Sequence, residues 1–146
     1  MKKIATYLII GLLSVLTSSF VNSDPKLIGK WKGADEKEKI GELVFEEGGY
    51  AYFILEGHKL GGKEFMMGDV NSFMIYETNT QKKPFEIDFI IKSHKTKEEL
   101  KRLTGIYSFL DSEKMKIRLN FNDNKRPKNF EPKNHEDIII LTRVNK

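Results

Sequence analysis

The stretch LIGKWKG, residues Leu27 to Gly33, contains the only tryptophan of the 146-residue chain, two positions after a glycine. A short run of this kind is typical of a β-strand, because an aromatic residue and alternating lysines suit a pleated, half-buried surface. The pattern Gly29-x-Trp31 is too short to specify more than a strand by itself. The residues on either side therefore decide which fold this strand begins.

Upstream of this stretch, the sequence predicts a secretory signal peptide over residues 1–23. A basic start and an apolar block from Ile4 to Leu16 are followed by Val21 and Ser23, at positions −3 and −1 before Asp24. An uncleaved membrane anchor is the alternative, but the apolar block is shorter than the roughly 20 residues that span a bilayer. The chain has no cysteine, which excludes lipid attachment of the bacterial lipoprotein type. We therefore expect a secreted or periplasmic protein with no transmembrane segment after cleavage.

The mature region, residues 24–146, is long enough for one domain. Two of the 25 basic residues lie in the predicted leader, so the mature domain has a formal charge of only +2. Lysine and glutamate alternate along the chain instead of clustering, which argues against nucleic acid as a partner. Without cysteine there is no disulfide framework, and the domain must bury a proper apolar core to be stable.

Alternation of apolar and polar residues dominates the mature chain and predicts β-strands with one dry face. The clearest runs are Phe85 to Ile91 and Met115 to Phe121. With the first stretch, the other predicted strands bring the total to about eight: Gly41–Phe45, Tyr50–Leu55, Val70–Glu77, Gly105–Leu110 and Ile138–Val144. Short strands separated by Gly, Asn and Asp turns predict an all-β sandwich or barrel.

Two segments fall outside this pattern. Lys95 to Lys101 is the one candidate helix, and it can equally be a solvated loop between strands. Asn122 to Glu136 predicts a long loop rich in Asn, Lys and Pro, and loops of that length are often functional or mobile.

Several short pieces, in order, carry a resemblance that spans nearly the whole mature chain. They are Leu27–Trp31, Pro84 with Ile87-Asp88, Gly105–Tyr107, Lys116-Ile117, Arg126-Pro127 with Phe130, and Leu141–Arg143. In these pieces the chain resembles the lipocalin-like family of short exported bacterial domains, the planctomycete-type domain of unassigned function. The resemblance implies an up-and-down antiparallel β-barrel of about eight strands, a size that can hold one small ligand. It implies no reaction, and this chain departs from classical lipocalins in its short length and its lack of a disulfide and of a long helix after the last strand.

The same resemblance implies a structural role for Gly29, Trp31 and Arg143. In lipocalins the tryptophan of G-x-W closes one end of the barrel, and an arginine from the last strand packs across its ring. Arg143 is the favoured partner here and Arg118 the second choice. A guanidinium over an indole contributes roughly 0.5–2 kcal/mol. We expect the pair to close the barrel and not to contact a ligand.

Catalysis and metal binding find little support in the sequence. His58, His94 and His135 stand alone, without the spacing that converging metal ligands need, so we expect no metal and no cofactor. Glu86 and Asp88 share the polar face of one predicted strand, where solvated carboxylates have no reason to shift their pKa values. Motifs for nucleophilic or phosphate chemistry are absent from the sequence as well. We therefore expect a protein that is not an enzyme.

The aromatic residues of the strands suggest the leading functional hypothesis, binding of a small apolar or amphipathic ligand inside the barrel. Tyrosine hydroxyls could orient such a ligand. The alternative is that the rings fill the interior completely, since eight strands are only just wide enough for side chains. The candidate ligand-binding residues are Tyr50, Tyr52, Phe73, Tyr76, Phe89, Tyr107 and Phe121.

The long loop suggests a second hypothesis, an envelope interaction module that binds a protein or cell-wall polymer through rim loops. Lys125, Arg126 and Lys128, with Lys133 nearby, could meet an acidic group. The structural alternative is that Pro127 stiffens the loop, Phe130 caps the core and Arg126 pairs with a surface carboxylate; we favour this reading because charged loops are usually just solvated.

Overall fold

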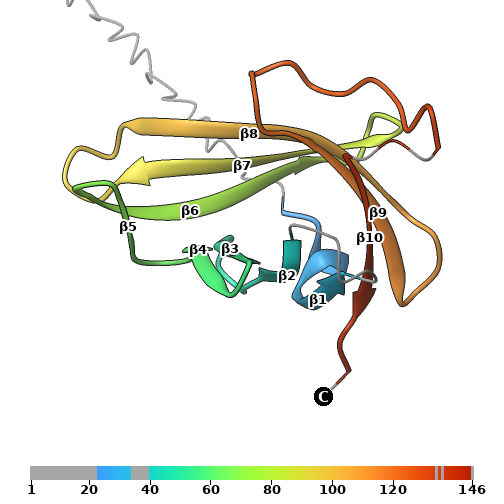
Figure 1. Ribbon diagram of the computed structural model, residues 1–146, viewed down its shortest axis with the longest axis horizontal. Coiled ribbons are helices and arrows are strands. Elements are labelled where there is room, and N and C mark those ends of the chain that lie inside the picture. Colours follow the sequence, from blue (N-terminus) through green and yellow to red (C-terminus); the bar gives the residue numbers. More distant parts are fainter. Residues whose placement is uncertain (1–22, 34–39, 134, 136, 146) are drawn as a thin grey trace, which may run out of the picture.

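The computed structural model describes residues 23–33, 40–133, 135 and 137–145, and these residues form one nearly closed antiparallel β-barrel (Figure 1). A short 3₁₀ helix leads into a sheet of ten strands, two more than the sequence predicts. The elements are η1 (Pro25–Leu27), β1 (Gly29–Gly33), β2 (Ile40–Phe45), β3 (Ala51–Leu55), β4 (His58–Gly61), β5 (Phe65–Met67), β6 (Val70–Asn79), β7 (Phe85–Ser93), β8 (Glu99–Phe109), β9 (Lys114–Asn120) and β10 (Ile138–Arg143).

The strands follow an up-and-down order, β4-β3-β2-β1-β10-β9-β8-β7-β6-β5. Neighbours in the sheet are consecutive in the chain except β1 and β10, which pair with Trp31 opposite Arg143. The sheet is open between β4 and β5. Across this seam, an isolated bridge joins Tyr50 to Ile75, and the Met74 amide donates to the Gly62 carbonyl at 2.9 Å. The barrel is therefore closed by a few contacts where a full ladder is missing.

Gly61 shows why glycine is needed at this seam. Its φ is +112°, a region that side chains rarely adopt. A Cβ atom at this position would lie 2.7 Å from the Ala51 carbonyl oxygen and 3.0 Å from the Met74 sulfur. Only glycine at position 61 therefore lets the chain turn away from β4 while β3 and β6 stay close to each other.

The candidate helix over Lys95 to Lys101 does not form, and the alternative considered for it, a loop between strands, describes residues 95–98. Residues 94–96 form a turn, and β8 begins at Glu99, opposite Lys92 of β7. Lys97 has a φ of +62°, which a right-handed helix does not contain, and its amide donates to the Ser93 carbonyl at 2.9 Å. Pairing with β7 outweighs the helical propensity of the short charged segment.

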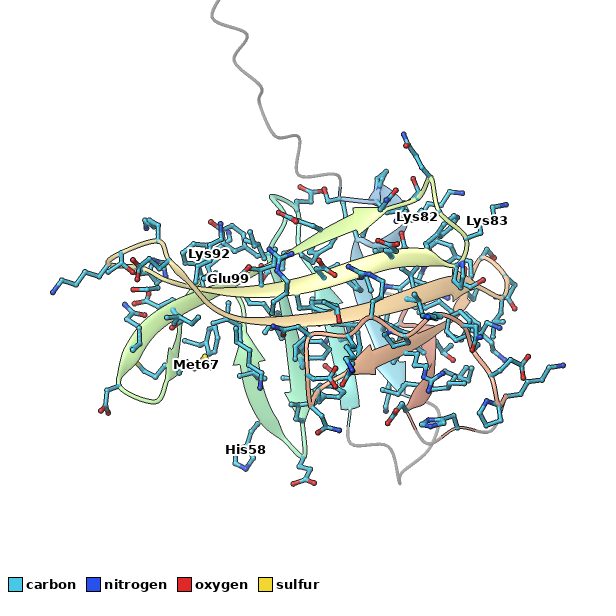
Figure 2. All side chains as sticks on the ribbon, turned by 90° about the horizontal axis from the view of Figure 1, so that it is seen from above. His58, Met67, Lys82, Lys83, Lys92 and Glu99 are labelled. Carbon is cyan, nitrogen blue, oxygen red and sulfur yellow. The ribbon has the colours of Figure 1, made fainter. Side chains whose placement is uncertain are left out.

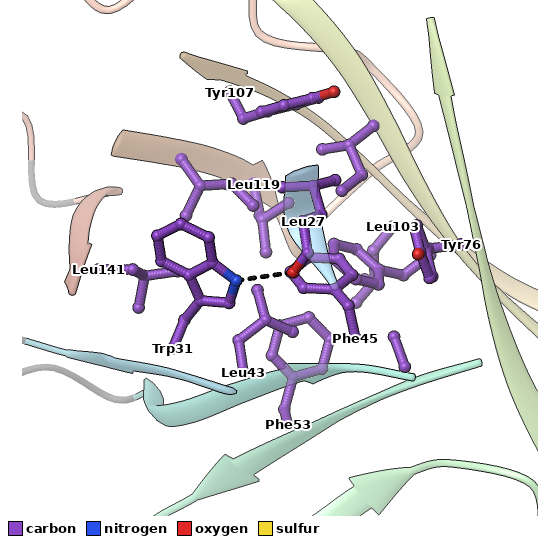
Figure 3. Close-up of a cluster of buried hydrophobic side chains, with 14 of the residues drawn as sticks. Leu27, Trp31, Leu43, Phe45, Phe53, Tyr76, Leu103, Tyr107, Leu119 and Leu141 are labelled. Carbon is purple, nitrogen blue, oxygen red and sulfur yellow. Dashed lines mark hydrogen bonds between the residues drawn. The ribbon is translucent and has the colours of Figure 1, made fainter. Parts of the chain in front are cut away.

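The interior of the barrel is filled by side chains from alternate positions of the strands (Figure 3). Aromatic rings from different strands meet edge to face: Phe45 packs on Tyr76 with ring centroids 4.7 Å apart, and Phe53 on Phe89 at 4.8 Å. Such pairs add to the stabilisation from buried area. The alternation that predicted the strands therefore also builds the core.

η1 and Trp31 pack together where the chain enters the barrel. The Trp31 side chain is fully buried, and its Nε1 donates to the Leu27 carbonyl at 2.8 Å (Figure 3). The Arg143 guanidinium lies 4.2 Å from the centre of the Trp31 ring and donates to the carbonyls of Ile28 and Lys26. A Cβ at Gly29 would lie 3.4 Å from Arg143 Nη1. Of the two arginines considered as partners of Trp31, it is Arg143 that makes the contact.

The predicted leader falls almost wholly on residues 1–22, which lie outside the described residues. The cleavage site before Asp24 and the export of the chain therefore stay predictions. Among the residues that are described, no helix is both long and apolar enough to cross a membrane.

Candidate functional site

Three of the seven aromatic residues predicted to bind a ligand lie in the interior. Tyr76, Phe89 and Tyr107 are fully buried and packed against other rings. Burial raises the pKa of Tyr76 and of Tyr107, and the nearby Asp24 carboxylate raises that of Tyr107 further. The Tyr107 hydroxyl donates to Asp24 Oδ2 at 2.8 Å, so it already has a partner within the protein.

The other four do not line the interior. Tyr50, Tyr52 and Phe73 point outward, because the buried residues Ala51, Phe53 and Met74 take the inward positions of the same segments. Phe121 follows the end of β9 and is 44% exposed. Their expected place inside the barrel is therefore corrected: alternation decides which face a residue takes, and the aromatic character of the residue does not.

The packed interior bears on the leading hypothesis. A ligand would have to displace side chains such as Phe53 and Phe89, whose rings are in contact. Two surface hollows, of about 370 Å³ and 110 Å³, are both lined by residues of the polar outer face and the β9–β10 connection. Binding of a small apolar ligand in the interior stays a prediction.

The loop from residue 121 to 137, between β9 and β10, is the most elaborate feature of the outer surface. It passes over the outer faces of β7 and β8 (Figure 1). Arg126 anchors it: its Nη1 lies 2.7 Å from Asp88 Oδ1 and donates to the carbonyls of Ile87 and Gly105, and its Nε lies 3.4 Å from Glu86. The guanidinium group of Arg126 is therefore used in contacts within the protein.

Glu86 and Asp88 lie on the polar face of β7, as the alternation requires, but they are not freely solvated. Their side chains are 21% and 14% exposed because the loop covers them. Arg102 of β8 donates to Asp88 at 2.7 Å and to Glu99 at 2.8 Å. Burial lowers the pKa of Arg102, but the hydrogen bonds to Glu99 and Asp88 outweigh it and leave that pKa raised. Asp88 therefore lies between two charged arginines, a structural arrangement.

Two further contacts hold the far part of the loop. Phe130 is buried, and the Lys116 ammonium lies 4.3 Å from the centre of its ring. Arg118 Nη1 donates to the carbonyls of Asn129 and Glu131 at 3.0 and 3.1 Å. Arg118 therefore contacts the loop. It does not contact Trp31, for which it was the second-choice partner.

The larger hollow, about 370 Å³, lies between this anchored loop and β9. Its charged lining consists of Arg118, Lys125, Arg126 and Lys128 on the basic side, with Asp123 and Asp137 on the acidic side. Lys125 and Lys128 are exposed and, within the described part of the chain, form no ion pair. The hollow is therefore lined by two arginines that hold the loop in place and by two lysines whose ammonium groups are available.

The three histidines do not converge. His58 is exposed on β4, His94 Nε2 lies 2.7 Å from the Lys63 carbonyl oxygen, and His135 lies 3.3 Å from Asp137. Within the described ranges, no group of three or more His, Asp or Glu side chains is arranged to hold a metal ion.

Arg102 is the charged residue of this region that sequence reasoning missed. The predicted strand began at Gly105, so Arg102 was left outside it. In the structure β8 begins six residues earlier, and Arg102 lies opposite Ile90 on the outer face. The alternation continues through Arg102 and Thr104 and could have placed both beside Asp88.

No family model, no curated protein and no solved structure matches this chain. The fold stands as an all-β, antiparallel, nearly closed barrel of ten strands, and the lipocalin-like relationship stays a prediction.

Proposed function

We propose that this chain is an exported, non-catalytic binding module that recognises an acidic group on a protein or cell-wall polymer with the loop between β9 and β10. The observation that supports this most is the hollow beside that loop, where Lys125 and Lys128 keep their ammonium groups available while arginines hold the loop in place. Export is part of the proposal and depends on the predicted leader.

A loop that is already ordered favours binding, because less conformational entropy is lost when a partner arrives. Arg126 fixes the first half of the loop to β7 and β8, and Arg118 fixes the second half to β9. Lys125 directly precedes Arg126, and Lys128 lies between Arg126 and the segment that Arg118 holds. A carboxylate or phosphate in the hollow would pair with both lysines without disturbing the arginines.

The available charge also limits the partner. Asp123 accepts hydrogen bonds from the Asn120 side chain and the Lys125 amide, so this carboxylate is used in the local turn. Four basic and two acidic side chains line the hollow, so its net charge is positive, and the field of these charges falls off over about 8–10 Å at physiological salt. A partner that carries repeated or clustered acidic groups fits this field better than a neutral one.

Charge reversal at the two lysines tests the proposal. Lys125→Glu with Lys128→Glu should abolish retention of the protein on immobilised poly-L-glutamate, while the wild type elutes at moderate salt. The matched control is Lys32→Glu with Lys114→Glu, two exposed lysines elsewhere on the barrel with the same change in charge. Retention unchanged in the loop variant, or lost equally in the control, would overturn the proposal.

A further inference from the structure

A second surface lies on the outer side of the barrel, across the seam between β3 and β6. Tyr50, Tyr52 and Phe73 point outward there, each partly exposed. The rings of Tyr50 and Phe73 come from opposite sides of the seam and have centroids 6.3 Å apart. His94 extends the group, with its ring 5.0 Å from that of Phe73. Tyr50, Phe73 and His94 therefore form one aromatic group across the seam, and Tyr52 lies beside it, two residues after Tyr50 on the same outer face.

Each of the three main rings has a lysine above it. The ammonium of Lys59 lies 4.3 Å from the ring centre of Tyr52, that of Lys63 5.7 Å from Tyr50, and that of Lys97 5.4 Å from Phe73. We call these three rings and three lysines the aromatic–lysine face. It is defined by Tyr50, Tyr52, Phe73, Lys59, Lys63 and Lys97.

Both lysines and carboxylates border the aromatic–lysine face. Lys92 lies directly opposite Phe73 on β7, at the end of the molecule away from Lys82 and Lys83 (Figure 2). Of the carboxylates nearby, Glu64 accepts a hydrogen bond from the Asn71 side chain, and Glu99, opposite Lys92 on β8, pairs with Arg102. Within the described part of the chain, Lys59, Lys63 and Lys97 form no ion pair. These three ammonium groups therefore contact aromatic rings and not carboxylates, which are the more usual partners of lysine.

We infer that the aromatic–lysine face binds an anionic polysaccharide, a polymer of sugar rings that carry carboxylate or phosphate groups. Such a polymer provides both complements at once. Its acidic groups attract the lysines away from the rings, and its apolar sugar faces then pack on the uncovered Tyr50 and Phe73. A lysine over an exposed ring is held only weakly, so this exchange is readily made.

The ring geometry distinguishes this partner from single-stranded nucleic acid. Successive bases stack on exposed, roughly parallel aromatic faces. The Tyr50 and Phe73 rings are inclined by 68° and partly buried, so they offer no such pair of faces.

The inference concerns a different surface from the proposed function, so each can fail without the other. We would measure binding of the purified protein to polygalacturonate, a polymer of uronic acid, by affinity electrophoresis, with neutral dextran and oligothymidylate in parallel gels. Polygalacturonate should retard the wild type, and dextran should not. Tyr50→Ala with Phe73→Ala should weaken binding about tenfold or more.

A second variant avoids any effect of the aromatic substitutions on folding. Lys59→Gln, Lys63→Gln and Lys97→Gln together change only exposed side chains and should also weaken binding about tenfold. The matched control is Lys32→Gln, Lys83→Gln and Lys114→Gln, three exposed lysines outside both proposed surfaces, and it should leave this binding unchanged. The inference is overturned if the lysine triple variant binds as the wild type does, if dextran binds equally, or if oligothymidylate binds more tightly than polygalacturonate.

Discussion

Tyr107 connects the core of the barrel to the start of the domain through a single hydroxyl group. The side chain is fully buried, and its hydrogen bond to Asp24 joins residues 83 positions apart. Burial and the Asp24 carboxylate both raise the pKa of Tyr107 above its ordinary value. The folded state therefore binds this proton more tightly than the unfolded state does.

A pH dependence follows from this raised pKa. The stabilisation is complete below the unfolded pKa of about 10 and is lost as pH rises above it, at about 1.4 kcal/mol per pH unit. Tyr107→Phe should cost about 2 kcal/mol at pH 8 and should reduce the steepness of the alkaline loss by one proton. Urea unfolding of the wild type and of Tyr107→Phe at pH 8, 10 and 11 measures this difference. The two proteins have the same lysines, so the contribution of the lysines cancels when they are compared. Parallel curves for the two proteins above pH 10 would contradict it.

Arg143 supports a second prediction at the scale of one residue. Its guanidinium covers Trp31 and donates to two backbone carbonyls of the segment that enters the barrel. Arg143→Met should cost about 2–3 kcal/mol, and Arg143→Lys nearly as much, because lysine lacks the planar fork that reaches both carbonyls.

Urea unfolding followed by the fluorescence of the single tryptophan measures these losses directly. The matched control is Lys32→Met, an exposed cation on the neighbouring strand position, which should change stability by less than about 0.5 kcal/mol. Equal stabilities of the Arg143 variants and the wild type would show that Trp31 closes the barrel without its arginine.

At the scale of elements, the β9–β10 loop is held by Arg126. Arg126→Gln removes its charge pairing with Asp88 and Glu86 and should cost about 1–2 kcal/mol, since the partners remain partly exposed and Asp88 keeps Arg102. It should also loosen the first half of the loop, so chymotrypsin should cleave after Phe121 faster than in the wild type. Lys128→Gln, in the same loop without an anchor, is the control. Unaltered cleavage in Arg126→Gln would show that other contacts order the loop.

The strands that the sequence predicted well are those with a continuous dry face. β9 alternates apolar and polar residues over its whole length and β7 does so from Phe85 to Phe89, so the pattern alone gives their position and most of their inward residues. β4 and β5 were missed because they are short and lack this pattern: β4 has three polar or glycine positions, and β5 is three consecutive apolar residues. Pairing with β3 and β6 forms these strands, and such tertiary pairing leaves little trace in the local sequence.

The candidate site was predictable in its residues but not in its division of roles. The sequence singled out Lys125, Arg126 and Lys128 together. Only the fold brings Asp88 and Gly105 beneath Arg126, from positions 38 and 21 residues earlier in the chain, and thereby separates an anchoring arginine from two available lysines. For the same reason, Tyr50 and Phe73 could not be recognised as neighbours from the sequence. They meet across the seam, where the two contacting segments are not consecutive strands of a hairpin.

At the scale of the whole molecule, the filled interior makes a prediction about small ligands. Native mass spectrometry of the wild type should show no bound benzene-sized molecule, because the rings of Phe45, Phe53 and Phe89 occupy the centre of the barrel. Phe89→Ala should cost about 3–5 kcal/mol and create a cavity that takes such a molecule. An adduct of constant mass on the wild type, purified from its own host, would instead support the predicted interior ligand.

The barrel is a ring that is opened in two different places. The backbone is interrupted between β10 and β1, yet these strands are paired, and Val144 continues the contact by donating to the Lys30 carbonyl at 2.9 Å. The hydrogen-bonded sheet is interrupted between β4 and β5, which the backbone joins directly. Every other ladder between the described strands connects consecutive strands, so β1 with β10 is the ladder that closes a long loop, while the bridge from Tyr50 to Ile75 closes a shorter one at the seam. A circular permutant that starts at Lys63 and ends at Gly62 would move the break in the backbone to the break in the sheet. Every ladder of its sheet would then be local, and only the contacts across the seam would join distant residues.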